Sequence, residues 1–95
     1  MKVLLVNGSP HENGNTAVAL REMERTFAQE GVETEVLQIG KQAVRGCVAC
    51  YGCRKLGKCV FDDAVNEAAS KLEAADGLVV ASPVYYASAN ATLVA

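Results

Sequence analysis

The 95-residue sequence lacks any apolar run long enough to cross a membrane, and it contains only one histidine, His11. We therefore expect no membrane-spanning helix and no membrane partner. The chain does not open with a charged segment followed by a long apolar core, so we expect no secretory signal and a cytoplasmic location. Its net charge of −2 gives no electrostatic reason to expect nucleic acid or an acidic membrane surface as a partner.

The opening residues also lack two familiar phosphate-binding loops. Val3 to Val6 is an unbroken apolar run, which predicts a strand buried on both faces of a parallel sheet. A nucleotide-triphosphate loop would then need a lysine where Asn15 stands, and it would have four residues between its glycines, whereas Gly8 and Gly14 are separated by five. A dinucleotide-binding loop would need a second glycine where Pro10 stands. Both of these nucleotide classes are disfavoured.

What remains between the first strand and the next helix is a loop of hydroxyl and amide groups without lysine or arginine. Backbone N–H groups at a helix N-terminus attract anions, so the loop suits one terminal phosphate, such as that of FMN. An ordinary strand-to-helix turn that binds nothing is the alternative. His11 either touches the phosphate or faces solvent. The candidate phosphate-binding residues are Ser9, His11, Asn13, Gly14, Asn15 and Thr16.

The rest of the chain alternates between helical and strand patterns, which predicts an α/β fold with right-handed connections. The second strand is more polar than the first, so we place it at the sheet edge. We predict a helix over 16–30 with Thr16, Leu20, Met23 and Phe27 buried, a strand over 32–39, a loop over 40–61, a helix capped by Asp62 or Asp63, a strand over 78–81, and a further helix beginning within 87–95 with Ser88 or Asn90 as its cap.

A second candidate binding segment follows the strand at 78–81. In open parallel sheets, ligands bind outside the carboxyl ends of the strands, at the point where the strand order reverses. Pro83 would stiffen the backbone beside a flavin ring, backbone amides could bond the ring edge, and a tyrosine could cover its face. The alternative is that the two tyrosines cap a core or an interface. The candidate ring-binding residues are Pro83, Val84, Tyr85, Tyr86 and Ala87.

All four cysteines fall in the loop over 40–61, with the spacing Cys47-x2-Cys50-x2-Cys53-x5-Cys59. The first three have the spacing that binds three corners of a [4Fe-4S] cluster, and the fourth can close the same cluster. Zinc is a weaker prediction, because structural zinc sites usually draw two pairs from separate turns. Free thiols remain open. Five of the nine basic residues surround the cysteines, which suits a negatively charged cluster or a nicotinamide phosphate: Lys41, Arg45, Arg54, Lys55 and Lys58.

Together these motifs resemble a known family. Gly8-Ser9-Pro10 followed by Asn13-Gly14-Asn15-Thr16, the segment from Ser82 to Tyr86, and the compact cysteine motif resemble the flavodoxin-like NAD(P)H-dependent FMN reductases, specifically their iron-sulfur flavoprotein branch. The resemblance implies a flavodoxin-like, doubly wound parallel sheet in a three-layer α/β/α arrangement. It covers only the N-terminal half of that domain, so residues 1–95 would supply strand, helix, strand, helix and strand.

The resemblance also implies a function. NAD(P)H would deliver a hydride to FMN, and electrons would pass to a small-molecule or protein acceptor, through a [4Fe-4S] cluster on the four cysteines. Members of the family are homo-oligomers, so we expect one here. Two alternatives stay open: an FMN-dependent quinone, azo or flavin reductase without a cluster, and a non-enzymatic electron carrier. The isolated half could also be catalytically inactive.

Overall fold

The computed structural model describes residues 1–95 and confirms the predicted α/β class. The main sheet has three parallel strands in the order β2-β1-β3, so the second strand lies at an edge as predicted. The elements in chain order are β1 (Lys2–Asn7), α1 (Asn15–Gln29), β2 (Glu33–Gln38), α2 (Cys53–Leu56), α3 (Ala64–Glu73), β3 (Gly77–Ala81), β4 (Val84–Tyr85), β5 (Ser88–Ala89) and α4 (Ala91–Val94).

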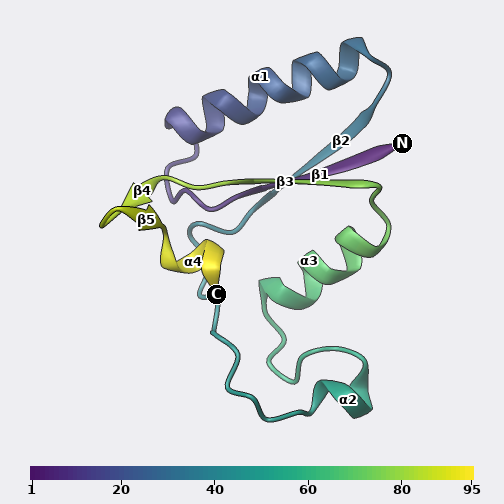
Figure 1. Ribbon diagram of the computed structural model, residues 1–95, viewed down its shortest axis with the longest axis vertical. Helices are drawn as coiled ribbons and strands as arrows, with labels where there is room; N and C mark the ends of the chain where they lie inside the picture. The colour runs from purple at the N-terminus through teal and green to yellow at the C-terminus, as the bar shows by residue number, and fades with distance from the viewer.

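Helices cover both faces of the sheet, which gives three layers (Figure 1). On one face α1 packs its Leu20 against Val3 and Leu5 of β1. On the other face Leu4 and Val6 of β1 pack with Ala64 of α3. Alternate residues of β1 point to opposite faces, and both faces are buried, so the apolar run that opens the chain is the centre of the fold.

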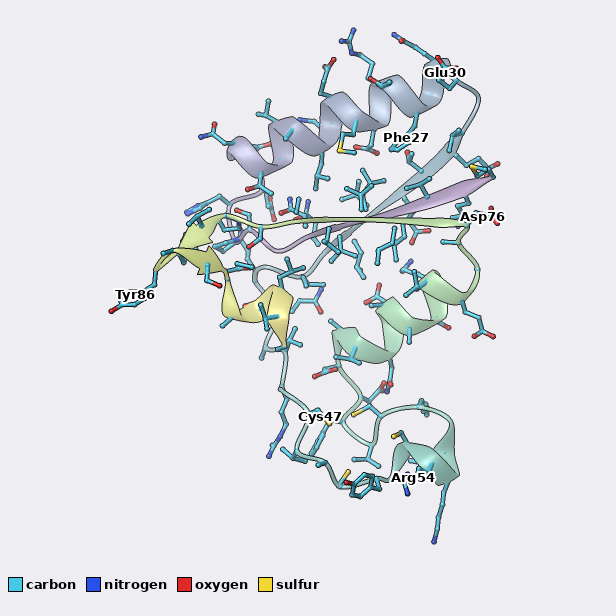
Figure 2. The ribbon with its side chains drawn as sticks, viewed as in Figure 1. Phe27, Glu30, Cys47, Arg54, Asp76 and Tyr86 are labelled. Atoms are coloured by element: carbon cyan, nitrogen blue, oxygen red, sulfur yellow. The ribbon has the colours of Figure 1, made fainter.

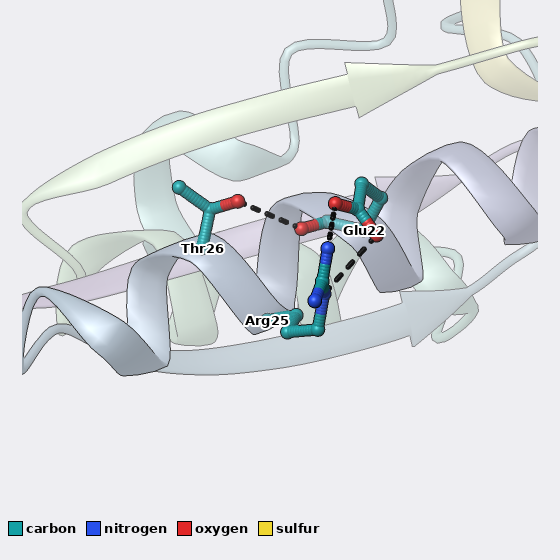
Figure 3. A network of polar contacts seen from close by, with 3 residues as sticks. All are labelled: Glu22, Arg25 and Thr26. Atoms are coloured by element: carbon teal, nitrogen blue, oxygen red, sulfur yellow. Dashed lines mark hydrogen bonds and ion pairs between the residues drawn. The ribbon is translucent and has the colours of Figure 1, made fainter.

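The outer face of α1 is charged and faces solvent. Arg25 pairs with Glu22 one turn earlier, and the hydroxyl of Thr26 donates to the carbonyl oxygen of Glu22 at 3.1 Å (Figure 3). Hydrogen bonding to Arg25 lowers the pKa of Glu22. This face carries surface ion pairing, which contributes little to stability.

One local prediction was wrong, and two others were confirmed. Met23 of α1 was predicted to be buried but is exposed, whereas Leu20 is buried as predicted, together with Ala17. No side chain caps α1, whose N-cap is Gly14. The chain over 84–89 forms a two-stranded hairpin, and α4 begins at Ala91 with Asn90 at its N-cap, so the predicted start of a helix within 87–95 is confirmed. Of the two proposed caps for α3, Asp63 is the correct one, because its side chain accepts from the N–H of Val65.

Strand β3 pairs with β1 on one side and forms an edge of the sheet on the other. Leu78 and Val80 of this strand are 49% and 57% exposed, although they belong to an apolar run of the kind found in central strands. They line an apolar groove of about 330 Å³ together with residues of α3 and α4. No helix in the structure has both the length and the apolar character that crossing a membrane would require.

Candidate functional site

The loops that follow β1, β2 and β3 meet at the carboxyl edge of the sheet (Figure 1). The N–H of Gly8, after β1, donates to the carbonyl oxygen of Ala81, at the end of β3, at 2.8 Å. Gly40, after β2, lies so close to Ser9 that a Cβ there would overlap its carbonyl group. We call the region formed by these three loops the edge crevice.

The loop after β1 is folded by its own polar groups. Asn7 is fully buried, and its Oδ1 accepts from the N–H of Ser9 at 2.8 Å. Ser9 is 5% exposed, and its Oγ accepts from the N–H of His11 at 3.1 Å. The Nδ2 of Asn7 is buried without a hydrogen-bond partner. The buried side chain of Ser9 therefore stabilises the turn, and its hydroxyl oxygen already accepts a hydrogen bond from the loop.

The N-terminus of α1 is left open at this loop. The first N–H groups of a helix have no partners within it, and here no side chain caps them and the first turn contains no acidic residue. These donors, with the positive end of the helix dipole, form a surface that favours an anion. The Asn13-to-Thr16 segment thus leaves backbone donors of the first turn without a side-chain partner.

Part of the predicted phosphate set lines an open cavity beside this helix end. His11, Asn13 and Gly14 line it, whereas Ser9, Asn15 and Thr16 do not. Lys41 from the loop after β2 also lines the cavity, and its ammonium group lies 3.5 Å from the carboxylate of Glu12. Arg21 donates to Oδ1 of Asn13 at 3.3 Å. The loop itself lacks a cation, but the fold brings two cations beside it.

Sequence reasoning missed Lys41 as part of this region. The signal was present, because Gly40 and Lys41 follow the second strand, and the carboxyl ends of parallel strands lie at one edge of the sheet. Arg21 carried a weaker signal, since it lies within the helix and its relation to Asn13 depends on how the loop turns into α1.

The predicted ring-binding segment forms the β4–β5 hairpin. Val84 pairs with Ala89 and Tyr85 with Ser88, which leaves Tyr86 and Ala87 as a two-residue turn. Both turn residues have left-handed backbones, with φ of 53° and 61°. Such hairpin turns prefer asparagine and glycine, so the tip is strained. Tyr86 is fully exposed and points away from the body of the molecule (Figure 2).

The part of the predicted 40–61 loop that carries the cysteines, residues 45–61, is called the cysteine loop here; it lies away from the hairpin and contains no buried residue (Figure 2). Its four thiols are free; those of Cys47, Cys50 and Cys53 are exposed and that of Cys59 is half-buried. All four nevertheless line one mostly apolar cavity of about 290 Å³. No three of these thiols, nor any other group of histidine, cysteine or acidic side chains, are arranged to hold a metal ion.

The first turn of α3 anchors both ends of the cysteine loop. The carboxylate of Asp63 accepts from the N–H of Arg45, two residues before Cys47, at 3.2 Å. At the other end, Asn66 accepts from the N–H of Cys59 at 2.9 Å and donates to its carbonyl oxygen at 3.0 Å. Hydrogen bonds from Val65 and Arg45 lower the pKa of Asp63.

Within the loop the backbone turns around Cys50. Ala49 and Tyr51, on either side of it, have left-handed backbones with φ of 57° and 63°. The N–H of Ala49 lies 3.4 Å from the sulfur of Cys47 and donates to it. Left-handed residues are typical of the concave turns that hold anions and iron-sulfur clusters, and hydrogen bonds to sulfur tune such clusters.

Two arginines stack on aromatic rings of the same loop. The guanidinium of Arg45 lies 4.3 Å from the ring centre of Phe61, and that of Arg54 lies 4.4 Å from that of Tyr51. The first pair joins the two ends of the loop. The predicted concentration of positive charge is therefore partly used in packing the loop.

Comparison with known families identifies the family of the chain. The family model described as NADPH-dependent FMN reductase matches residues 1–95. The chain belongs to this family. The predicted family is thus confirmed, and the three-stranded parallel sheet is the flavodoxin-like part of a NADPH-dependent FMN reductase fold.

Relatives of this FMN reductase family member include several iron-sulfur flavoproteins. The chain is 39% identical to one from Methanocaldococcus jannaschii over 93 residues, which is 98% of this chain and 48% of the relative. It is 36% identical to one from Methanosarcina thermophila, covering 98% of this chain and 49% of the relative. A third, from Archaeoglobus fulgidus, is 31% identical, with coverages of 98% and 42%. The chain spans about half the length of the curated relatives it matches.

Proposed function

We propose that this chain forms the cofactor-binding part of an NAD(P)H-dependent FMN oxidoreductase that passes electrons to an acceptor through a [4Fe-4S] cluster. The observation that carries the proposal is the geometry of the edge crevice. The loop after β1 leads to the uncapped N–H groups of α1, and β3 leads to the β4–β5 hairpin; a hydrogen bond from Gly8 to Ala81 joins these two segments. When bound, FMN accepts a hydride from a nicotinamide, and an iron-sulfur cluster carries single electrons.

The loop after β1 fits the phosphate of FMN. The free donors at the start of α1 would bind its oxygens, and Asn13 and Gly14 line the cavity where it would lie. Lys41 favours a dianion there, whereas Glu12 opposes it. The buried Nδ2 of Asn7 has no partner, so the loop also has an unused donor behind it. The charges of Lys41 and Glu12 oppose each other, so the cavity offers the phosphate no cation free of a neighbouring acid.

The hairpin fits the ring. Pro83, Val84 and Tyr85 follow the end of β3 after one intervening residue, and the backbone over 84–87 would orient the ring edge. Tyr86 is at the tip and is free to cover an aromatic face, of the flavin or of a molecule that approaches it. The strain at Tyr86 and Ala87 supports a functional role for this turn.

The cysteine loop fits a cluster in its donor set and backbone. Cys47, Cys50, Cys53 and Cys59 would be the ligands, because they line one cavity and at least one sulfur already accepts a backbone N–H. The names of the relatives support an iron-sulfur group. Because the thiols are not gathered for a metal ion, the loop must rearrange when it binds one.

The wider roles follow from these sites. We propose that the partners are a nicotinamide and a small-molecule or protein acceptor, that the protein acts as a homo-oligomer, and that it works in the cytoplasm. An FMN-dependent reductase without the cluster is the second candidate, favoured by the exposure of three of the thiols.

One preparation tests the core of the proposal. The full natural polypeptide is purified anaerobically and assayed for flavin, iron and sulfide, and NADH and NADPH oxidation is followed with an artificial acceptor. We expect one FMN and one cluster per chain and oxidation of at least one nicotinamide. Flavin without iron would select the reductase that lacks a cluster. A colourless protein that does not bind added FMN would refute the oxidoreductase.

Two matched variants test the phosphate cavity. Glu12→Gln removes the negative charge and is expected to strengthen FMN binding a few fold, whereas Lys41→Gln is expected to weaken it by a similar factor, about the range of exposed ion pairs. Riboflavin lacks the phosphate, so its affinity should change in neither variant. Equal effects on FMN and riboflavin would contradict placement of the phosphate beside these residues.

A further inference from the structure

Asn90 joins two loops of the edge crevice through its side chain. The residue is 5% exposed and directly precedes α4. Its Nδ2 donates to the carbonyl oxygen of Gly8, in the loop after β1. Its Oδ1 accepts from the hydroxyl of Ser82, in the loop after β3, at 2.9 Å, and its own N–H donates to that hydroxyl oxygen at 2.9 Å. One buried amide thus connects the two loops to which the flavin is assigned.

Helix capping does not account for this side chain. Asparagine at an N-cap ordinarily accepts an N–H of the first turn, and this is what makes it favourable there. Asn90 occupies the N-cap of α4 but makes no such bond. Its amide is used entirely by Gly8 and Ser82, so its identity is set by the contact between loops.

The backbone of Gly8 packs closely against the side chain of Asn90. A Cβ at residue 8 would lie 2.8 Å from Oδ1 of Asn90 and 2.9 Å from Cβ of Leu93. Only glycine lets the backbone after β1 approach the start of α4 this closely. The glycine that opens the Gly8-Ser9-Pro10 motif therefore makes room for the asparagine, a role distinct from phosphate binding.

We propose that Asn90 is a positioning residue that holds the phosphate loop and the ring loop at a fixed separation, so that FMN binds both at once. The inference rests on the proposed function. A ligand with two recognised ends gains affinity when its two sites are held at the matching distance, because the second contact becomes intramolecular. Loops that are already fixed also lose less freedom on binding. Without the bond to Gly8, each end of FMN would bind more nearly alone.

The test compares FMN with riboflavin, which carries the ring without the phosphate. Asn90→Asp keeps an acceptor for Ser82 but removes the donor to Gly8. In the full natural polypeptide we expect FMN affinity to fall about tenfold, the loss of one buried hydrogen bond, while riboflavin affinity falls by much less. The FMN-to-riboflavin affinity ratio is the measured quantity, because a general loss of stability would lower both affinities together.

Three further measurements complete the experiment. Asn66→Asp makes the same chemical change at the cysteine loop and should leave the ratio unaltered. Asn90→Asp also adds a negative charge that would repel the phosphate of FMN but not riboflavin. Ser82→Ala weakens the other side of the connection without adding charge, and it should lower the ratio by a smaller factor that repulsion cannot explain; it also keeps the test available if Asn90→Asp folds poorly. Without ligand, amide exchange of Gly8 and Ser9 should accelerate in Asn90→Asp, while that of Leu5 in β1 stays slow.

The outcomes separate this inference from the proposed function. An unchanged ratio in Asn90→Asp, or equal loss of FMN and riboflavin, overturns the positioning role although FMN still binds. If the unaltered protein binds neither flavin, the proposed function fails, and the exchange rates of Gly8 and Ser9 then decide whether Asn90 fixes the loops: unchanged rates refute it.

Discussion

The edge crevice and the cysteine loop are built in opposite ways. The crevice is held by buried polar groups, with Asn7, Ser9 and Asn90 each at most 5% exposed; Asn7 and Ser9 accept hydrogen bonds within the loop after β1, and Asn90 bonds across to that loop. The cysteine loop has no buried residue and is fixed mainly at its ends, by Asp63 and Asn66 of α3. The edge crevice is thus shaped before any cofactor binds, whereas the cysteine loop supplies only four thiols and the hydrogen bonds that fix its two ends.

The difference matches what each region would bind. An organic cofactor contacts its site through many directional bonds, so a preformed crevice limits the ordering cost of binding. A metal cluster makes a few strong bonds to thiolates, and its binding energy can organise the chain that carries them. We therefore expect the crevice to be sensitive to small steric changes and the cysteine loop to tolerate them where no atom lies close, as at Gly46.

The largest expected effect comes from adding one methyl group to the crevice. Gly40→Ala places a Cβ against the backbone of Ser9, which cannot move as a flexible side chain would. Overpacking of this kind costs about 1–3 kcal/mol, and we expect the upper end of this range in the free energy of unfolding, measured with urea. FMN binding should weaken as well, because the displaced loop carries the phosphate site.

Gly46→Ala is the matched change in the cysteine loop. A Cβ at this position meets no atom within 4 Å, so the free energy of unfolding should change by less than about 0.5 kcal/mol. Equal destabilisation by the two substitutions would contradict the contrast between a packed crevice and an open loop.

The next effect should be confined to the cysteine loop. Asn66→Ala removes both hydrogen bonds to the backbone of Cys59, the fourth predicted ligand. Residues that orient metal ligands typically contribute about 10–100-fold to metal affinity, so iron should be lost to a chelator at least tenfold faster. FMN affinity should be unaffected. Iron release at the rate of the unaltered protein would show that Cys59 needs no anchor.

The fold was predictable because its signals are local and strong. Val3 to Val6 is apolar on both faces, and the turn and cap residues around it leave few alternatives to a central strand followed by a helix. A cap at Asp62 or Asp63 was recognisable from the position of the two residues before an apolar periodicity, and the structure selects Asp63. The hairpin at 84–89 was missed, because Tyr86 and Ala87 are not residues that favour a left-handed turn.

The connections within the site were not predictable from the sequence. Asn90 is separated from Gly8 by 82 residues, and its sequence context is that of a helix cap. Gly40 and Lys41 follow β2, so their place at the carboxyl edge of the sheet could be expected, but their contact with the phosphate loop is shown only by the packing. The cysteine spacing indicated the donor set, but spacing alone cannot show that the thiols are spread along an exposed loop.

A smaller effect is expected at the hairpin tip. Ala87 has φ of 61°, a conformation that costs a residue with a Cβ about 1–2 kcal/mol and costs glycine much less. Ala87→Gly should therefore raise the free energy of unfolding by about 1 kcal/mol once the greater freedom of glycine in the unfolded chain is included. Ala89→Gly, in β5, is the control and should lower it. A loss of stability in Ala87→Gly would show that the turn is not strained.

The smallest expected effect is a pH dependence at the anchor of the cysteine loop. The N–H groups of Val65 and Arg45 lower the pKa of Asp63 below its ordinary value of 3.8. A carboxyl whose pKa is lower in the folded state stabilises that state above its ordinary pKa, and this contribution is lost as pH falls through the folded pKa. Acidification should therefore release the amide of Arg45 and loosen the loop, whereas the edge crevice has no carboxylate in its buried network. An NMR titration of the Val65 and Arg45 amides should give a common midpoint below 3.8, which disappears in Asp63→Asn; a midpoint at or above 3.8 would mean that Asp63 does not hold the loop.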